Sequence, residues 1–504
     1  MASKALSLAV GCALAGAASA QDIVPRVFTP LPTGSVTPKG WLLKQLRLQA
    51  EGLSGHLSMF WNDIKETVWI GGTGDGGLHE RTPYWLNGVV PLSYLLKNAG
   101  GQHILPGVRG VYKAADGFGH GHDTPLVELI SDGVIDATNS TCQQNVDMMY
   151  HDISKQAAGS QDECYAQCAG DPASLGWVWD ECDKLCWCKN ALGVTNNASC
   201  RCFGTMPPRP IPAVNMSAQV ETYMDYILSH QTEDGWLGPP DEEASQDGNK
   251  WWGRSNVLLA MCMYAEAEPS RFDAVTTSMK NYMLLMEKQL SASSPALTDW
   301  AAARWMDLVL STQWMLLNAK NLSDDDRASL WNLATLLHEQ GQDWETWFHT
   351  FGSNDTMHNV NLAQALKSAA VWYGMTDNAT LRYLSEERMH RIDHEWGLPT
   401  GMFNGDEWTP APHTRNPSRG IELCGVVEAM FSYNTMFSVF GNVAFADRAE
   451  RVAYNALPAT WASPTGGDMW AHQYVCVCRT LHHNQPFASD IVILCLASSG
   501  TCRR

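Results

Sequence analysis

Positive charge is scarce in this sequence. Its 504 residues contain 34 lysines and arginines against 53 aspartates and glutamates, so the net charge is −19 at pH 7. A negative surface repels phosphate backbones and anionic lipids, which argues against nucleic-acid binding and against binding to membranes. We therefore expect a protein that acts on an uncharged partner.

Long apolar runs are missing after the N-terminus, which argues against a membrane-spanning protein. The chain begins MASKALSLAVGCALAGAASAQ, where Lys4 precedes a short apolar run and Ala18-Ser19-Ala20 forms a small-residue cleavage signal. This pattern predicts a secretory signal peptide over residues 1–20 and a secreted, extracellular protein. Six Asn-x-Ser/Thr sequons agree with export, and we expect several to carry surface glycans: Asn139, Asn197, Asn215, Asn321, Asn354 and Asn378.

Cysteine is unevenly spread along the chain. Eight of the 15 cysteines lie between 142 and 202, an even and dense cluster that predicts a disulfide-stapled module in an exported protein. Eight cysteines allow many pairings, and the sequence assigns none of them. A zinc site is the weaker alternative, because the C-x-C spacings here differ from the usual C-x₂₋₄-C. The eight are Cys142, Cys164, Cys168, Cys182, Cys186, Cys188, Cys200 and Cys202.

Part of this cluster, DECYAQCAGDPASLGWVWDECDKLCWCKN at 162–190, resembles a PAN/apple module. That family has a short helix with two cysteines, here Cys164 and Cys168 at i,i+4. An aromatic strand follows, and then a "CWLK"-like strand, here CWCK at 186–189, in which Cys188 departs from the pattern. Such modules bind glycans or proteins, so the resemblance implies an accessory binding module.

Strand signals are few outside this module, and helical periodicity takes their place. In 323–340, Ser323 is a good N-cap, three aspartates follow at the positive helix end, four leucines form an apolar stripe, and Gly341 ends the run. Successive helices joined by short turns predict an all-α array of hairpins, as a toroid or a solenoid. Similar helices are predicted over 255–267, 271–289, 300–318, 359–374, 379–394, 425–440 and 444–457.

A thiol and a carboxylate lie two residues apart in GIELCGVVEAMFSY, residues 420–433. On a helix Glu422 and Cys424 would point in different directions, whereas an extended segment places both on one face. The helical stripe starts at Val426, so we expect both residues in the extended entry to that helix. There they could hold one zinc ion, which takes thiolate and carboxylate ligands. The alternative is a buried thiol beside a carboxylate that stabilises the helix N-terminus.

A second acidic pair, Asp406-Glu407, lies in the Gly/Pro-rich loop that leads to this thiol. Loops on a rigid helical scaffold often carry catalytic groups, so a carboxylate here could act as a general acid. The alternative is a solvated loop acid. The 21 tryptophans also have two interpretations, because indole rings either fill a core or stack on the C–H faces of sugars.

Four stretches resemble the DUF1680 group, the family 127-type glycoside hydrolases related to β-L-arabinofuranosidases. They are GGLHERTPYWLNGVVPLSYLLKN (76–98), QVETYMDYILSHQTEDGWLGP (219–239), MHNVNLAQALKSAAVWYGMT (357–376) and the run from TGMFNGDEWTPAPHTRNPSRGIELC to residue 461, followed by DMWAHQY. The resemblance implies a mainly α fold, an (α/α)₆ toroid of helical hairpins. The β-rich domains that follow the toroid in this family are absent from this sequence.

Characterised members of this family are retaining enzymes, in which three cysteines and one glutamate bind a zinc ion that holds the cysteine nucleophile. The resemblance implies that Glu422 and Cys424 are two of these zinc ligands and that Glu407 is the general acid/base. It also implies that His358 lines the sugar pocket. Further candidates for this pocket, each of which could instead be structural, are Trp85, His79 and Glu80.

The adjacent cysteine pair that supplies the family's nucleophile is missing from this sequence. The resemblance ends at Tyr474, after which the chain continues VCVCRTLHHNQPFASDIVILCLASSGTCRR. Val-Cys-Val-Cys is encoded by GTN-TGY-GTN-TGY, which fits a splice donor, so one hypothesis is that 475–504 is translated intron. The other is a genuine tail in which Cys476 and Cys478 act as substitute ligands.

The sequence as a whole predicts a secreted glycoside hydrolase that acts on an oligo- or polysaccharide, uses zinc and carries an inserted module for a glycan or protein ligand. Without the nucleophile the chain would be inactive, and the alternative is a secreted, non-catalytic carbohydrate- or protein-binding protein. The expected parts are a signal peptide (1–20), a helical part (21–135, without clear periodicity over 98–135), a Cys-rich insertion (136–205), the rest of the toroid (206–474) and a tail (475–504).

Overall fold

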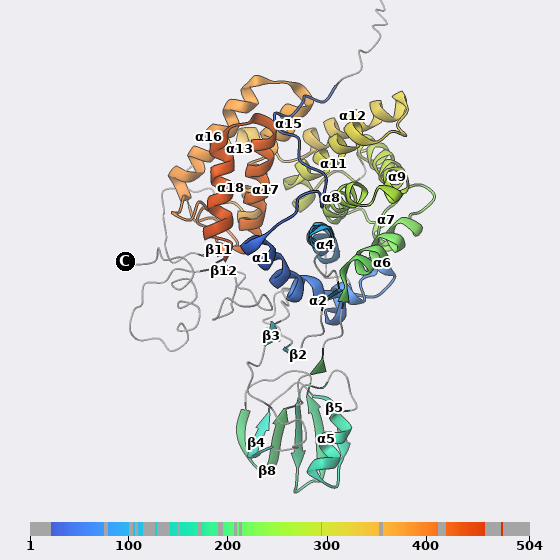
Figure 1. Cartoon of the computed structure of the whole chain (residues 1–504), viewed down its shortest axis with the longest axis vertical. Coiled ribbons are helices and arrows are strands. Elements are labelled where there is room, and N and C mark those ends of the chain that lie inside the picture. The colour runs from blue at the N-terminus through green and yellow to red at the C-terminus, as the bar shows by residue number, and fades with distance from the viewer. Residues whose placement is uncertain are drawn as a thin grey trace, which may run out of the picture.

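The computed structural model describes residues 22–74, 79–99, 104–105, 109–113, 126–128, 142–148, 152–169, 174, 176–189, 195–205, 209–210, 214–293, 295–351, 356–411, 420–458 and 475–476. These residues form an array of paired helices and, below it in Figure 1, a small β-sheet. The predicted mainly helical fold with a disulfide-rich insertion is therefore confirmed. The predicted signal peptide, the sequons Asn139 and Asn354 and the tail after 476 lie outside the described residues.

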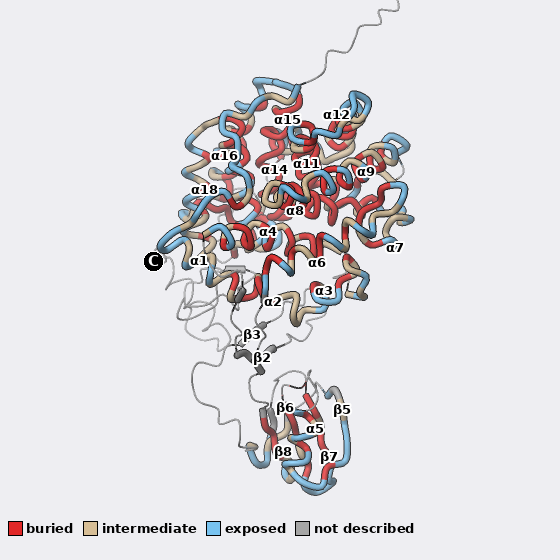
Figure 2. The backbone as a smooth tube through the Cα atoms, turned by 45° about the vertical axis from the view of Figure 1, so that its right-hand side comes forward, coloured by how far each residue is buried: buried red, intermediate tan, exposed pale blue. Residues whose placement is uncertain are grey.

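Two rows of helices make up the helical part. The inner helices pack side by side in chain order and are α4 (Arg81–Asn98), α8 (Trp251–Ala267), α11 (Trp305–Asn318), α15 (Ser368–Thr376) and α17 (Leu423–Phe440). Each is paired with an outer helix: α6 (Met216–Ser229), α9 (Phe272–Ser291), α12 (Asp324–Gln340), α16 (Ala379–Trp396) and α18 (Val443–Asn455). Figure 2 shows buried backbone concentrated in the inner row, and exposed backbone on the outer row.

Shorter elements connect these hairpins. The helices α1 (Gly40–Glu51), α2 (Leu53–Phe60), α3 (Asn62–Lys65) and η1 (Val68–Ile70) lead into the first inner helix. The remaining connections are α7 (Pro240–Glu243), η2 (Gly248–Lys250), η3 (Pro269–Arg271), α10 (Asp299–Ala303), α13 (Trp344–Thr350) and α14 (Asn359–Ala365). Every helix predicted from periodicity is present within a few residues, but two are broken: one at Arg304, and one between α14 and α15.

The start of α12 shows why the helix ends could be predicted. The Ser323 hydroxyl accepts a hydrogen bond from the Asp326 backbone N–H (3.1 Å), and the Asp326 carboxylate accepts one from the Ser323 N–H (2.9 Å). This reciprocal pair is a capping box, which satisfies two N–H groups that lack partners inside the helix. The hydrogen bond from Ser323 holds the pKa of Asp326 below its usual value.

Residues 22–36 form an N-terminal strap across the C-terminal ends of the inner helices. The strap's Val24 N–H donates to Gly374 O of α15 (2.9 Å), and its Phe28 N–H donates to Ser438 O of α17 (2.9 Å). At its other end, Thr33 donates from its N–H and hydroxyl to the Glu266 carboxylate of α8, both at 3.0 Å. The strap therefore closes one end of the helical array and leaves the N-terminal helix ends on the other side.

The Cys-rich insertion is a five-stranded antiparallel sheet in the order β4-β8-β6-β7-β5. Its helix α5 (Gln161–Ala169) carries Cys164 and Cys168, which are disulfide-bonded to Cys186 and Cys188 on β7; the other bridges are Cys142–Cys202 and Cys182–Cys200. All eight clustered cysteines are thus paired, as the sequence predicted for the cluster as a whole. The strands are β4 (Gln143–Met148), β5 (Asp152–Ala157), β6 (Gly176–Asp180), β7 (Leu185–Lys189) and β8 (Thr195–Thr205).

Short antiparallel strand pairs join this sheet to the helices. β1 (Ile104–Leu105), just after α4, pairs with β10 (Val214–Asn215), just before α6. β2 (Arg109–Lys113) pairs with both β3 (Leu126–Glu128) and β9 (Arg209–Pro210). Elsewhere β11 (Ile421–Glu422) pairs with β12 (Val475–Cys476) at the start of α17.

One helix corrects the expectation that no segment after the N-terminus is long and apolar enough to cross a membrane. By length and composition alone, the 18-residue α17 meets that test, yet 61% of it is buried inside the fold. It packs against α14, α15 and α18. Its apolar composition therefore fits a core helix of the array.

Candidate active site at the N-terminal ends of the inner helices

The N-terminal ends of the inner helices gather on the side opposite the strap. This follows from the hairpin arrangement, in which every inner helix runs in the same direction and every outer helix returns. Helix N-termini present unpaired N–H groups and a partial positive charge, so they favour polar and anionic groups nearby. Residues from four of these ends, and from the short helices beside them, form the cluster described next.

His358 lies at the centre of an aromatic cluster. Its ring meets Trp300 of α10 edge-on at 4.8 Å between centroids and Trp408 of the acidic loop at 5.6 Å. The residue is only 7% exposed, and among the described residues its Nδ1 has no hydrogen-bond partner. Burial, with the nearby positive charge of Arg304, lowers the pKa of His358 to about 4. A neutral imidazole has one ring nitrogen that donates and one that accepts, so it can hydrogen-bond to a ligand hydroxyl that reaches the ring.

Arg304 links this cluster to the other inner helices. Its guanidinium lies between Trp252 and Trp300, with 4.7 and 5.0 Å to the ring centroids. It donates to the Asn361 side-chain oxygen and to the Tyr84 hydroxyl, both at 2.9 Å. The break between α10 and α11 allows Arg304 to leave the helical path and to bridge α4, α8 and α14. Burial raises the pKa of the Tyr84 phenol, so this hydroxyl stays protonated.

A buried ionic row lies behind Arg304. The Lys367 ammonium is 2.9 Å from an Asp307 carboxylate oxygen and 3.8 Å from one of Glu428, and Lys367 is fully buried. Burial raises the pKa of Glu428, and the charge of Lys367 opposes this. Glu428 and Cys424 both influence the Tyr84 phenol electrostatically, which places the start of α17 next to Tyr84. The negative charges of Asp307 and Glu428 are thus balanced by the positive charges of Lys367 and Arg304. These four residues lie beneath the aromatic cluster.

The acidic loop is held against the segment that carries His358. His358 and Trp408 form an isolated antiparallel bridge, the Asn359 N–H donates to Glu407 O (3.0 Å), and the Thr409 N–H donates to Met357 O (2.9 Å). Glu407 and Trp408 are both exposed, Trp408 by 48%. Glu407 is therefore a solvent-facing carboxylate on the rim of the cluster, one residue from an exposed indole.

Glu422 and Cys424 lie at the first turn of α17. Glu422 is the N-cap residue with extended backbone and is 1% exposed, whereas Cys424 is already helical and is exposed. The expectation that both lie in an extended segment is therefore wrong for Cys424, because α17 begins at Leu423, three residues before Val426. The register of β11 with β12 sets Glu422 opposite Val475 and Ile421 opposite Cys476. Cys476 is thus not the direct neighbour of Glu422.

A zinc site would need more donors than these two. Glu422 and Cys424 are of the types that zinc accepts, but a closed site takes four. Among the described residues the one group of three or more close donors is Cys164, Cys168 and Cys186, and all three are in disulfides. A disulfide sulfur is not the thiolate that binds a metal. The described donors therefore supply at most half of a zinc site.

Three other candidates from the sequence lie in structural networks. Trp85 is buried against Tyr223 (4.8 Å between centroids), and its indole N–H donates to Ser54 O (2.8 Å). The His79 ring is 3.0 Å from the Glu242 carboxylate, which raises the His79 pKa through a hydrogen bond. Glu242 also binds Arg254, whose guanidinium is stacked between Trp69 and Trp236. Glu80 lies next to this network before α4, and burial raises its pKa.

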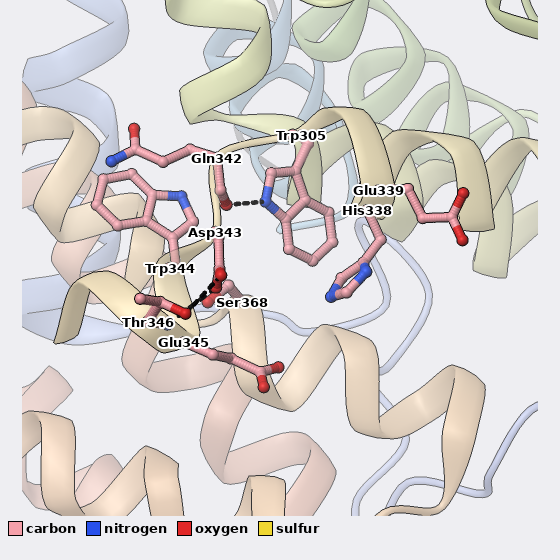
Figure 3. A pocket seen from close by; sticks show the side chains of 10 residues that line it. Trp305, His338, Glu339, Gln342, Asp343, Trp344, Glu345, Thr346 and Ser368 are labelled. Atoms are coloured by element: carbon pink, nitrogen blue, oxygen red, sulfur yellow. Dashed lines mark hydrogen bonds between the residues drawn. The ribbon is translucent and has the colours of Figure 1, made fainter. Parts of the chain in front are cut away.

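A separate pocket of about 370 Å³ opens between α11, α12, α13 and α15 (Figure 3). Its groups serve the local fold: Trp305 and Trp344 are buried and donate to backbone carbonyls, and Asp343 caps α13 through the Thr346 N–H (2.9 Å). Its lining residues are Trp305, His338, Glu339, Gly341, Gln342, Asp343, Trp344, Glu345, Thr346 and Ser368. None of them belongs to the aromatic cluster around His358.

Sequence reasoning missed four members of the aromatic cluster: Tyr84, Trp252, Trp300 and Arg304. Each lies in a different stretch of chain from His358; Tyr84 falls within the family-like stretch 76–98, and the other three lie outside the four quoted stretches. The available signal was weak, since Tyr84 adjoins Trp85 and Arg304 interrupts a predicted helix. Only the packing of the inner helices brings them together.

A histidine in an aromatic cluster with a few polar groups around it suits a small ligand that has both apolar faces and hydroxyl groups. Residues 212–485 match the sequence profile described as the GH127 catalytic domain of β-L-arabinofuranosidases. This match covers more than half of the chain, which therefore belongs to that family. The match also extends past Tyr474, so the expectation that the resemblance ends at that residue is wrong. No curated protein matches the chain.

Several solved structures are similar to the chain. A GH127 β-L-arabinofuranosidase from Geobacillus stearothermophilus T6 is 13% identical, with a TM-score of 0.41 over 53% of this chain and 46% of that one. A GH127 β-arabinofuranosidase is 13% identical, with 0.39 over 56% and 47%. A structure described as a glycoside hydrolase is 15% identical, with 0.40 over 57% and 52%. The chain spans about half the length of these proteins.

Proposed function

We propose that this chain is the helical part of a secreted glycoside hydrolase that cleaves an arabinofuranoside-like sugar from an oligo- or polysaccharide. The observation that carries the proposal is His358, held between Trp300 and Trp408, whose buried Nδ1 has no hydrogen-bond partner among the described residues. Aromatic faces accept the C–H surface of a sugar, and the ring nitrogen accepts one of its hydroxyls. The family match supplies the class of reaction.

Glu407 is the proposed general acid/base. From the rim of the cluster its carboxylic acid would donate a proton to the leaving glycosidic oxygen, and its carboxylate would then take a proton from the attacking water. The nucleophile of a retaining mechanism is not assigned to any described residue. Glu422 and Cys424 are proposed zinc ligands; bound zinc would keep sulfur ligands deprotonated at neutral pH.

Replacing Glu407 by Gln tests the acid/base role. We expect kcat on an aryl β-L-arabinofuranoside to fall by at least about 100-fold, with sugar binding retained, because the amide cannot exchange the proton. Glu339→Gln is the matched control, since Glu339 is an exposed carboxylate in the separate pocket of Figure 3. Unchanged kcat in Glu407→Gln would remove Glu407 from the mechanism.

The metal assignment is tested by metal analysis of the purified protein. Cys424→Ser should lower the bound zinc per chain, because serine oxygen is a poorer zinc ligand than thiolate. Cys262→Ser is the control, as Cys262 is the other described thiol outside the disulfides and is buried in α8. Equal zinc content in the two variants would show that Cys424 is not a ligand.

A non-catalytic sugar-binding protein is the second candidate. It is favoured by the same cluster, because His358 and the tryptophans would bind sugar without turnover. Sugar binding by the wild-type chain without hydrolysis would decide for it. We also propose that the Cys-rich insertion is a PAN/apple-like binding module, since the two-cysteine helix α5 and the CWCK strand β7, on which the resemblance rests, are joined by two disulfides. Glycan-array binding by the intact chain, lost when that module is deleted, would test this role.

A further inference from the structure

The buried side chain of Asn359 occupies the junction of three segments that carry proposed site residues. Asn359 is the first residue of α14, directly after His358, and is fully buried. Its side-chain amide donates to Gly405 O (2.8 Å), two residues before Glu407. Gly405 O also accepts from the Glu422 N–H (3.2 Å), at the entry to α17. One carbonyl oxygen therefore joins α14, the acidic loop and the start of α17.

Two glycines leave space for this carboxamide. A Cβ on Gly405 would lie 3.2 Å from Asn359 Cγ, and a Cβ on Gly425 would lie 2.6 Å from Asn359 Nδ2. The second distance is shorter than real Cβ contacts, so any side chain at Gly425 would force the amide to move. The carboxamide is thus held between the acidic loop on one side and the first turn of α17 on the other.

The backbone of Asn359 adds a second connection. Its N–H donates to Glu407 O (3.0 Å), so main chain and side chain of one residue fix both ends of the segment 405–407. Among the described residues the side-chain oxygen of Asn359 has no partner, although it is buried. A buried amide that keeps an unpaired acceptor is retained at a cost in stability, which suggests a role other than packing.

We propose that Asn359 is the positioning residue that aligns Glu407 with Glu422 and Cys424 across the sugar held by His358. The effect of Asn359 on catalysis rests on the proposed function, whereas its hydrogen bonds to the acidic loop do not. When the amide is lost, its bond to Gly405 O is lost, and the acidic loop shifts relative to the start of α17 while His358 keeps its contact with Trp300. A displacement of about 1 Å between groups that must act together can lower a rate about 100-fold.

The test compares two variants that disturb this junction with one matched control. Asn359→Leu removes the amide at similar volume. Gly425→Ala keeps the amide but inserts a methyl group against it, although alanine is the better helix former. The control is Gln313→Met, because the Gln313 amide is also buried and donates to a backbone oxygen, that of Val371 (2.7 Å). It also lies beside a glycine, Gly374, where an added Cβ would come within 2.8 Å of the amide nitrogen.

Hydrogen–deuterium exchange of the full chain gives a readout that needs no activity. We expect peptides covering 403–411 and 420–424 to exchange about tenfold faster in Asn359→Leu and Gly425→Ala, and to be unchanged in Gln313→Met. The second variant keeps the test valid if the first fails to fold. Wild-type exchange in both peptides of the folded junction variants would overturn the proposal.

Kinetics on the aryl β-L-arabinofuranoside separates positioning from general loss of structure. We expect kcat of both junction variants to fall about 100-fold with KM nearly unchanged, because the sugar still binds at His358. A raised KM with normal kcat would overturn the positioning role. If the wild-type chain hydrolyses nothing, the proposed function fails, whereas the exchange result still decides whether Asn359 holds the junction.

Discussion

At the scale of single residues, His358 combines deep burial with a titratable ring. Its pKa is about 4 in the folded chain and about 6.5 in an unfolded one, so folding excludes its proton. Because the folded pKa is lowered, its contribution to stability is complete above pH 6.5 and is lost as the pH falls toward 4. The ring that we propose to bind sugar therefore also makes the fold sensitive to acid.

Replacing His358 by Gln should remove this acid sensitivity. Between pH 6.5 and 4, the free energy of unfolding should fall less steeply in the variant than in wild type, by up to about 1.4 kcal/mol per pH unit. Urea unfolding at three pH values measures the slope, and His390→Gln, at an exposed position of α16, is the control. Parallel slopes for wild type and His358→Gln would contradict the buried, neutral ring.

At the scale of elements, local signals predicted helices well and their interruptions poorly. The capping box at Ser323 and the apolar stripe of α12 are local, and the predicted ends agree with the structure within a residue. The break at Arg304 could not be predicted, because it depends on the Tyr84 hydroxyl and on Trp252, which come from other segments of the chain. The start of α17 was placed too late, since Leu423 and Cys424 are helical although they precede the stripe.

The same division applies to the candidate site. Spacing singled out Glu422 and Glu407 but left each with a plain structural alternative, and only the resemblance to a family pointed to His358. The structure places His358 beside the loop of Glu407 through a backbone bridge. Trp85 was selected and Tyr84 was not, because neighbours on a helix face different directions and the sequence does not say which face meets the cluster.

At the scale of the whole molecule, the N-terminal strap connects helices that are far apart in the sequence. The Ser438 hydroxyl donates to Phe28 O (2.6 Å) across 410 positions, and Gly441, with a φ of 69°, leaves room for Val27 where a Cβ would clash. The strap also covers carbonyl groups at the C-terminal ends of α15 and α17. It therefore contributes to the stability of the array as a unit rather than to one hairpin.

Glu266→Gln tests the contribution of the strap. The carboxylate accepts two bonds from Thr33 and one from Trp314 (2.7 Å), so neutralising it should lower the free energy of unfolding by about 1.5–3 kcal/mol. Urea unfolding measures this, with Glu287→Gln as the control, since this acid of α9 accepts exposed hydrogen bonds from Ser291 and Asn332, neither of which belongs to the strap. Deleting the residues before 37 should lower the free energy of unfolding more than either substitution does. Equal urea midpoints for wild type and all variants would show that the strap does not contribute to stability.

The β1–β10 pair has a consequence for how the chain tolerates its insertion. Ile104 lies opposite Asn215, so the entry and exit of everything between them meet within one strand spacing. For the helices, the insertion is then equivalent to a hairpin turn, and its length adds little to the loss of chain entropy on folding. All four disulfides of the described residues lie within the insertion, and none of these joins it to the helical array. We therefore expect that another module with a similar distance between its ends could replace the sheet without changing how the helices pair.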